Sequence, residues 1–146
     1  MNRLILLVAD QPAALKQIQG ALQECGMCVD LSVAKDGVVA MALLQRKGEH
    51  ADAPRPDLII LDLNLSGKDG REVLAEIKAD DKLKRIPVVI LTVSESEEDI
   101  LKTYNLQANC YITKPIHLRQ FVEIIKSVQN FWLTIVTLPP PRTPHG

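Results

Sequence analysis

The stretch Leu58-Ile59-Ile60-Leu61-Asp62-Leu63-Asn64-Leu65 decides the fold. It opens with a short, continuous aliphatic run, which is typical of a strand buried on both faces in the middle of a parallel sheet. Asp62 follows where that strand should end. Because ligands of open α/β sheets bind at the carboxyl ends of the strands, we expect the Asp62 carboxylate to face a crevice rather than the core. The alternative is that this acid only begins the turn that follows.

Further short apolar runs alternate with helical patterns along the chain. Strands are expected at 4–8, 29–33, 58–62, 87–92 and 110–113, and helices beginning near residues 12, 37, 70, 96 and 118. Strict alternation predicts an α/β fold with a five-stranded parallel sheet, doubly wound, with helices on both faces and right-handed crossovers. The order 2-1-3-4-5 would place the switch point between the first and third strands. The second helix should stop at Gly48.

Composition narrows the function classes. The 146 residues carry a net charge of −1, which does not indicate a nucleic-acid-binding surface. Hydrophobic residues make up 47% but aromatic residues only 3%, so the core should be aliphatic. No signal-peptide pattern and no apolar run of roughly 18 residues is found, so we expect a cytoplasmic protein without a membrane span.

The C-terminal part differs from the rest. We assign one domain to residues 1–131 and an extension to 132–146. An apolar segment near its start has too little chain after it to be covered, which favours an interface, although the segment could also fold back on its own domain. A proline-rich stretch follows and is expected to be disordered. The apolar residues are Phe131, Trp132, Leu133 and Val136.

Four polar residues are expected to meet at the carboxyl edge of the sheet. Asp10, Asp62, Thr92 and Lys114 each lie at the end of a different strand. Two carboxylates and a backbone carbonyl would form a hard-oxygen site, which suits Mg²⁺ better than zinc. A lysine and a hydroxyl opposite them suit a phosphoryl group. An aspartate can accept such a group as an acyl phosphate.

With these residues in place, the sequence resembles the response-regulator receiver domains of two-component signalling, over roughly residues 4–131. The marks are Asp10, Asp62 with Asn64, Asp69-Gly70, the strand 86–92 and Lys114-Pro115. The resemblance implies the flavodoxin-like receiver fold and a phosphoacceptor rather than an enzyme, with only self-catalysed phosphotransfer and dephosphorylation.

The same resemblance implies individual roles. Asp62 would be the phosphoacceptor, and Asp10, Asp62 and the Asn64 carbonyl would bind Mg²⁺. Thr92 and Lys114 would contact the phosphoryl oxygens. The bond before Pro115 would be cis, and Tyr111 would be the aromatic residue that moves inward on phosphorylation. A half-buried strand aromatic is the plainer interpretation of Tyr111.

Residues 40–45, 49–56, 69–78 and 131–139 look like the small stand-alone regulators of cyanobacterial phytochromes. This closer resemblance implies no fused output domain and a sensor histidine kinase of phytochrome type as partner. It also implies a homodimer through the last helix, the fifth strand and the tail. Phosphorylation would then change the surface formed by the fourth helix, the fifth strand and the fifth helix.

One departure leaves an alternative open. Receivers usually have two adjacent acids after the first strand, and here the first of them is Ala9. Loss of such a partner typically lowers metal affinity or activity about 10- to 100-fold, so weaker Mg²⁺ binding is expected. The alternative function is a degenerate receiver that acts as a phosphorylation-independent docking or dimerisation module. A flavin-binding protein of the same topology is disfavoured, because the strand-end loops lack aromatic residues.

Overall fold

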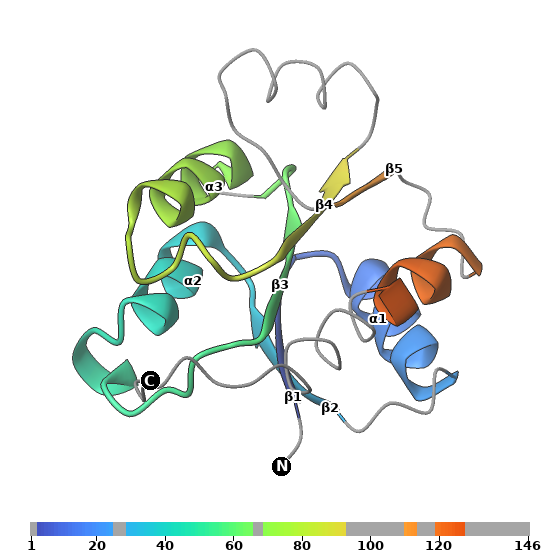
Figure 1. Ribbon diagram of the computed structural model, residues 1–146, viewed down its shortest axis with the longest axis horizontal. Helices are drawn as coiled ribbons and strands as arrows, with labels where there is room; N and C mark the ends of the chain where they lie inside the picture. Colours follow the sequence, from blue (N-terminus) through green and yellow to red (C-terminus); the bar gives the residue numbers. More distant parts are fainter. Residues whose placement is uncertain (1–2, 25–28, 66–68, 93–109, 114–118, 128–146) are drawn as a thin grey trace, which may run out of the picture.

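The computed structural model describes residues 3–24, 29–65, 69–92, 110–113 and 119–127 (Figure 1). Strands and helices alternate in the described part. The elements are β1 (Arg3–Val8), α1 (Pro12–Glu24), β2 (Val29–Ala34), α2 (Gly37–Leu44), a 3-10 turn η1 (Gly48–His50), β3 (Leu58–Asp62), α3 (Gly70–Ala79), β4 (Val88–Thr92) and β5 (Cys110–Thr113). Residues 119–127 are helical as well.

The strands form one parallel sheet in the order β2-β1-β3-β4-β5, which confirms the expected topology. β3 lies in the middle, between β1 and β4. All residues of β3 and of β4 are buried. The continuous aliphatic run that begins at Leu58 therefore has the position that it predicts, because only a strand covered on both faces can bury every side chain.

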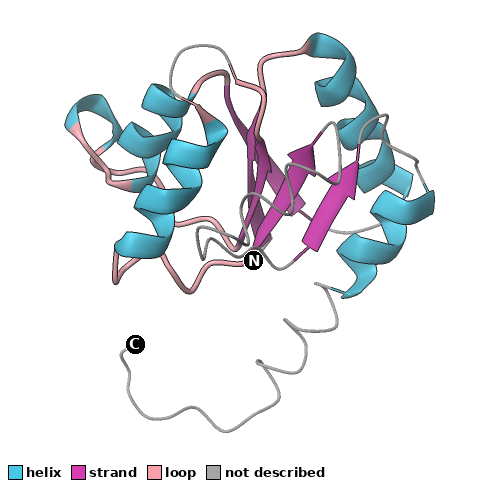
Figure 2. Ribbon diagram, turned by 90° about the horizontal axis from the view of Figure 1, so that it is seen from above, coloured by secondary structure: helices cyan, strands magenta, loops and turns pink. Residues whose placement is uncertain are grey.

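Two apolar clusters form the core, one on each face of the sheet. Ile59 and Leu61 of β3 belong to the cluster covered by α2 and α3. Leu58 and Ile60 belong to the cluster covered by α1 and the helical segment 119–127. Figure 2 shows these helices in two layers with the sheet between them. The alternation follows from the period of two along a strand, and it confirms the doubly wound architecture.

Helix α2 begins as expected and ends earlier than expected. Asp36 caps its N-terminus, with the carboxylate accepting a hydrogen bond from the Val39 N–H at 2.8 Å. The helix stops at Leu44 rather than at Gly48. The cause is Arg46, which takes the left-handed conformation (φ 55°) that usually falls to glycine after a helix.

The predicted extension lies outside the described residues. The interface predicted for Phe131, Trp132, Leu133 and Val136 and the boundary between 131 and 132 therefore stay predictions. Among the described helices, none combines the length and the apolar character that a bilayer span requires.

Candidate functional site

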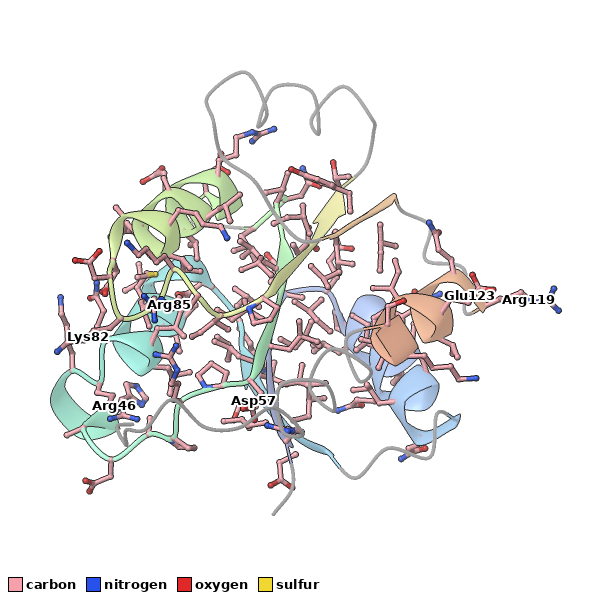
Figure 3. All side chains as sticks on the ribbon, viewed as in Figure 1. Arg46, Asp57, Lys82, Arg85, Arg119 and Glu123 are labelled. Atoms are coloured by element: carbon pink, nitrogen blue, oxygen red, sulfur yellow. The ribbon has the colours of Figure 1, made fainter. Side chains whose placement is uncertain are left out.

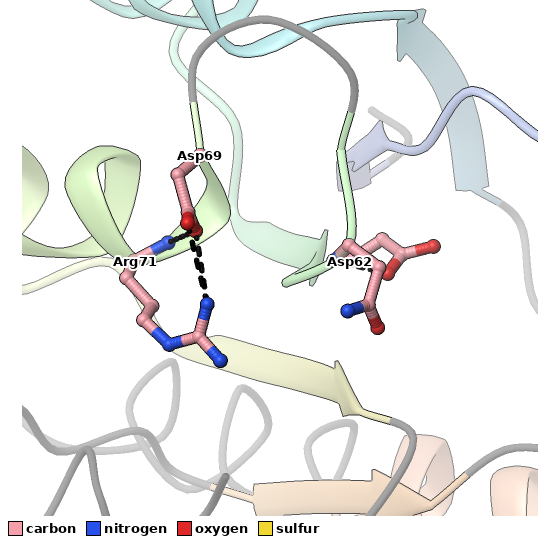
Figure 4. A network of polar contacts seen from close by, with 4 residues as sticks. Asp62, Asp69 and Arg71 are labelled. Atoms are coloured by element: carbon pink, nitrogen blue, oxygen red, sulfur yellow. Dashed lines mark hydrogen bonds and ion pairs between the residues drawn. The ribbon is translucent and has the colours of Figure 1, made fainter.

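Asp62 is the last residue of β3 and lies at the carboxyl edge of the sheet. Its side chain is fully buried, so the expected open crevice is wrong for the carboxylate itself. One carboxylate oxygen accepts a hydrogen bond from the Asn64 N–H at 2.9 Å, which fixes the side chain over the turn that follows (Figure 4). Burial of a carboxylate is costly unless positive charge or hydrogen bonds compensate it, so the hydrogen bond from the Asn64 N–H helps to stabilise the charged form of Asp62.

Helix α3 begins directly against the end of β3. Asp69 caps it by accepting a hydrogen bond from the Arg71 N–H at 2.8 Å. The Arg71 guanidinium also lies 3.3 Å from the same carboxylate (Figure 4). These contacts hold the beginning of the helix beside the turn after Asp62.

The role of Gly70 was not predicted from the sequence beyond its place in the family pattern. A Cβ on Gly70 would lie 2.6 Å from the Asp62 carbonyl oxygen and 2.6 Å from the Leu63 Cα. Both neighbours are backbone atoms, which cannot rotate away. Only glycine therefore allows α3 to begin this close to the candidate phosphoacceptor. A glycine as the first residue of the helix after the acidic strand end is the signal that could have shown it.

We expect Gly70→Ala to lower the free energy of unfolding by about 1–3 kcal/mol, because the added methyl group overpacks against the β3 backbone. Urea unfolding followed by circular dichroism measures this change. The matched control is Gly20→Ala, since Gly20 lies within α1 and the added Cβ would have no atom within 4 Å apart from its chain neighbours and the backbone of its own helix. There the smaller entropy of the unfolded chain should stabilise the protein by about 0.4–1 kcal/mol. Equal effects of the two substitutions would contradict the close approach.

The register of the sheet places Ala9 beside Asp62. The last pair between β1 and β3 is Val8 with Leu61. The next residues, Ala9 and Asp62, are therefore neighbours at the ends of the two strands. The Ala9 N–H continues the ladder on its other side, to the Ala34 carbonyl at 3.1 Å. Its methyl group is fully buried in the cluster under α1. The position at which the family resemblance leads us to expect an acid is therefore apolar, buried and next to the candidate phosphoacceptor.

Asp10 and Thr92 lie at the same edge of the sheet as Asp62. Asp10 follows Ala9 and is half-buried, whereas Thr92 ends β4 and is fully buried. β4 pairs with β3 up to Leu91 and Asp62, so Thr92 extends one residue farther along the edge. These three residues are thus brought to neighbouring strand ends, as the sequence predicts.

The remaining predicted residues fall partly outside the described part. Thr113 pairs with Thr92 and is the last residue of β5, and Lys114 and Pro115 follow it outside the described residues. Tyr111 pairs with Ile90 and packs, half-buried, against the cluster under α2 and α3. This placement agrees with the plainer interpretation of Tyr111 as a half-buried strand aromatic.

The residues at this edge fit Mg²⁺, but with one carboxylate fewer than the family resemblance leads us to expect. Within the described ranges, no three His, Cys, Asp or Glu side chains gather as a metal site. Among the described residues at this edge, Asp10, Asp62 and the backbone carbonyl of exposed Asn64 are the oxygen donors expected to bind the metal. Hard oxygen ligands of this kind suit Mg²⁺, which usually keeps several waters and needs only one or two carboxylates. A third carboxylate at position 9 is missing.

Comparison with known proteins identifies the family. The sequence pattern of the response regulator receiver domain matches residues 5–126. The response regulator Rcp1 of Synechocystis sp. is 48% identical over 137 residues, which cover 94% of this chain and 93% of that protein.

Two solved structures extend the similarity to the fold. The phosphorylated cyanobacterial phytochrome response regulator RcpA is 51% identical and superimposes with a TM-score of 0.78, covering 96% of this chain and 100% of that one. The Mn²⁺-bound form of Rcp1 is 48% identical and superimposes with a TM-score of 0.76, covering 94% of this chain and 99% of that one. These matches confirm the resemblance to receivers, and to the cyanobacterial phytochrome regulators among them. This chain belongs to the response regulator receiver domain family.

Proposed function

We propose that this chain is a response regulator that accepts a phosphoryl group on Asp62 from a sensor histidine kinase of phytochrome type, in a Mg²⁺-dependent reaction. The observation that carries the proposal is the position of Asp62, which is the terminal, fully buried residue of the central strand β3, beside the ends of β1 and β4. Its relatives Rcp1 and RcpA are described as response regulators, and RcpA as a phosphorylated one.

The chemistry is a direct transfer between two side chains. An Oδ atom of Asp62 attacks the phosphorus of a phosphohistidine, the new O–P bond forms as the N–P bond breaks, and the electron pair returns to the imidazole nitrogen. The hydrogen bond from the Asn64 N–H orients the attacking carboxylate. A bound Mg²⁺ would supply positive charge to the carboxylates and the phosphoryl oxygens. Asp10, Asp62 and the Asn64 carbonyl are the proposed ligands.

Thr92 and Lys114 are proposed to receive the phosphoryl oxygens, the first by a hydroxyl hydrogen bond and the second by its charge. Tyr111 would then repack. This shift biases the surface formed by β5 and the segments on either side of it, which is where a homodimer through Phe131, Trp132, Leu133 and Val136 would form. We also propose a cytoplasmic localisation, which would place this chain in the same compartment as the kinase that donates the phosphoryl group.

Acetyl phosphate tests the proposal without a kinase. In the presence of Mg²⁺, the intact mass of the wild-type protein is expected to increase by one phosphoryl group, and chelation of the metal should prevent the increase. Retention of full labelling after chelation would contradict the metal-dependent mechanism. No labelling at any Mg²⁺ concentration would contradict phosphoacceptor function.

A second function is favoured by one observation, the buried and apolar Ala9 beside Asp62. If the missing acid abolishes metal binding, the chain acts as a docking or dimerisation module whose state does not depend on phosphorylation. Sedimentation velocity with and without beryllofluoride as a phosphoryl mimic distinguishes the two functions. A change in the monomer–dimer distribution supports the switch, and an unchanged distribution supports the module.

A further inference from the structure

A cavity lies at the opposite edge of the sheet from Asp62. It measures about 480 Å³, is partly open to solvent and is lined by the end of α2, the segment before β3 and the segment before β4. The first two segments lead into β3 and the third leads into β4, so the cavity is at the amino ends of these strands, whereas the proposed phosphoacceptor is at the carboxyl ends. Its lining residues are Leu43, Leu44, Gln45, Arg46, Lys47, Pro54, Arg55, Asp80, Lys82 and Leu83.

The walls of the cavity are basic. Arg46, Lys47, Arg55 and Lys82 line it with one acid, Asp80, which gives the lining a formal charge of +3. The whole chain has a net charge of −1, so this charge is local. Figure 3 shows Arg46 and Lys82 on the same side of the molecule, beside α2.

Few acids offset this charge. The four basic side chains form no ion pair with a carboxylate of the described residues. Asp80 accepts a hydrogen bond from the Lys82 N–H at 2.7 Å. The nearby Asp81 lies 2.9 Å from the Lys84 ammonium, and the hydrogen bond and charge of that lysine lower the Asp81 pKa. The acids on this segment are therefore already engaged.

The backbone is strained where it presents one of these cations. The Arg46 N–H reaches the Leu43 carbonyl at 3.2 Å and the Lys47 N–H reaches the Ala42 carbonyl at 3.0 Å, which is the Schellman pattern of a helix end. The left-handed residue of this pattern is usually glycine, and here it is Arg46. Strain kept in a non-glycine residue points to a use for its side chain.

The inner part of the cavity is apolar. Leu44 and Leu83 are buried in the cluster under α2 and α3, and Leu43 packs against it. The Arg55 guanidinium donates a hydrogen bond to the Lys82 carbonyl and so joins two of the walls. A nucleotide base would find no aromatic ring among the lining residues. An apolar floor below a rim of exposed cations instead matches a ligand that has apolar side chains flanked by several negative charges.

We propose that this cavity binds an acidic peptide segment of a partner protein, with an aliphatic side chain on the leucine floor and carboxylates paired with Arg46, Lys47, Arg55 and Lys82. Peptide binding at the amino edge of the sheet leaves the carboxyl edge, where Asp62 lies, uncovered. The two activities are independent, so Asp62→Asn should bind the peptide as the wild-type protein does.

Fluorescence anisotropy tests this with the full chain and a labelled short peptide in which glutamates and aspartates flank two leucines. Binding should weaken as the salt concentration rises from about 0.05 to 0.5 M, because the ion pairs are exposed. Lys47→Glu should lower the affinity about 3- to 10-fold, whereas Lys16→Glu, the same charge change on the exposed face of α1, should not.

Arg46→Gly separates binding from folding. It should lower peptide affinity about 2- to 5-fold while leaving the thermal midpoint unchanged or raising it by up to about 3 °C, since glycine relieves the left-handed strain. The proposal is overturned if the peptide does not bind at low salt, or if Lys16→Glu weakens binding as much as Lys47→Glu. It is also overturned if inorganic phosphate at matched ionic strength displaces the peptide, because the site would then recognise small anions.

Discussion

Asp62→Asn is expected to abolish labelling by acetyl phosphate while leaving the fold intact. The amide has no nucleophilic oxygen anion to form the acyl phosphate. Its carbonyl oxygen can still accept the hydrogen bond that the Asn64 N–H gives to the carboxylate. Because asparagine has nearly the volume of aspartate and keeps this hydrogen bond, the protein should still unfold in one cooperative thermal transition. Intact mass and thermal unfolding measure the two effects on the same sample.

Asp10→Asn is the matched control for this variant. It removes a proposed metal ligand and keeps the nucleophile, so labelling should become slower and require more Mg²⁺, without being abolished. A phosphoryl adduct on Asp62→Asn equal to that of the wild type would show that another residue accepts the group.

Ala9→Asp is expected to raise the affinity for Mg²⁺ about 10- to 100-fold. Ala9 lies level with Asp62 in the register of β1 and β3, so the introduced carboxylate would stand beside the phosphoacceptor. It would be close enough to orient metal-bound water or to contact the ion itself. Isothermal titration calorimetry with Mg²⁺ measures the affinity, and labelling by acetyl phosphate should require correspondingly less metal.

The same substitution should destabilise the metal-free protein. The Ala9 methyl group is fully buried among aliphatic side chains, and a carboxylate there loses its hydration next to a second carboxylate. The expected cost is about 1–5 kcal/mol. Saturating Mg²⁺ should restore about 2.7 kcal/mol at one hundred times the dissociation constant. Ala9→Asn, which adds the volume without the charge, is the control, and equal Mg²⁺ affinity of both variants would contradict the role assigned to this position.

The position of Asp62 was predictable from the sequence because one local pattern determines it. A short aliphatic run can bury every residue only in a central strand, and β3 is that strand. The acid that ends the run must then lie at the carboxyl edge. Its complete burial was not predictable, because the burial of a strand-end side chain depends on contacts between elements that are far apart in the sequence.

The end of α2 and the basic cavity were missed for different reasons. Gly48 seemed the natural helix stop, but Arg46 takes the left-handed conformation that local preference gives to glycine. The cavity collects cations from segments around residues 46, 55 and 82, which only the folded sheet brings together. Its one sequence signal is a basic residue shortly before each of two central strands, and that pattern alone is too common to interpret.

Mapping the phosphoryl group to a residue tests the proposed chemistry most directly. The wild-type protein is labelled with acetyl phosphate and Mg²⁺, reduced with borohydride, which converts an aspartyl phosphate to homoserine, and digested for mass spectrometry. We predict homoserine at position 62 and at no other aspartate. Homoserine at Asp10 or elsewhere, with Asp62 unmodified, would contradict the assignment of Asp62 as the phosphoacceptor.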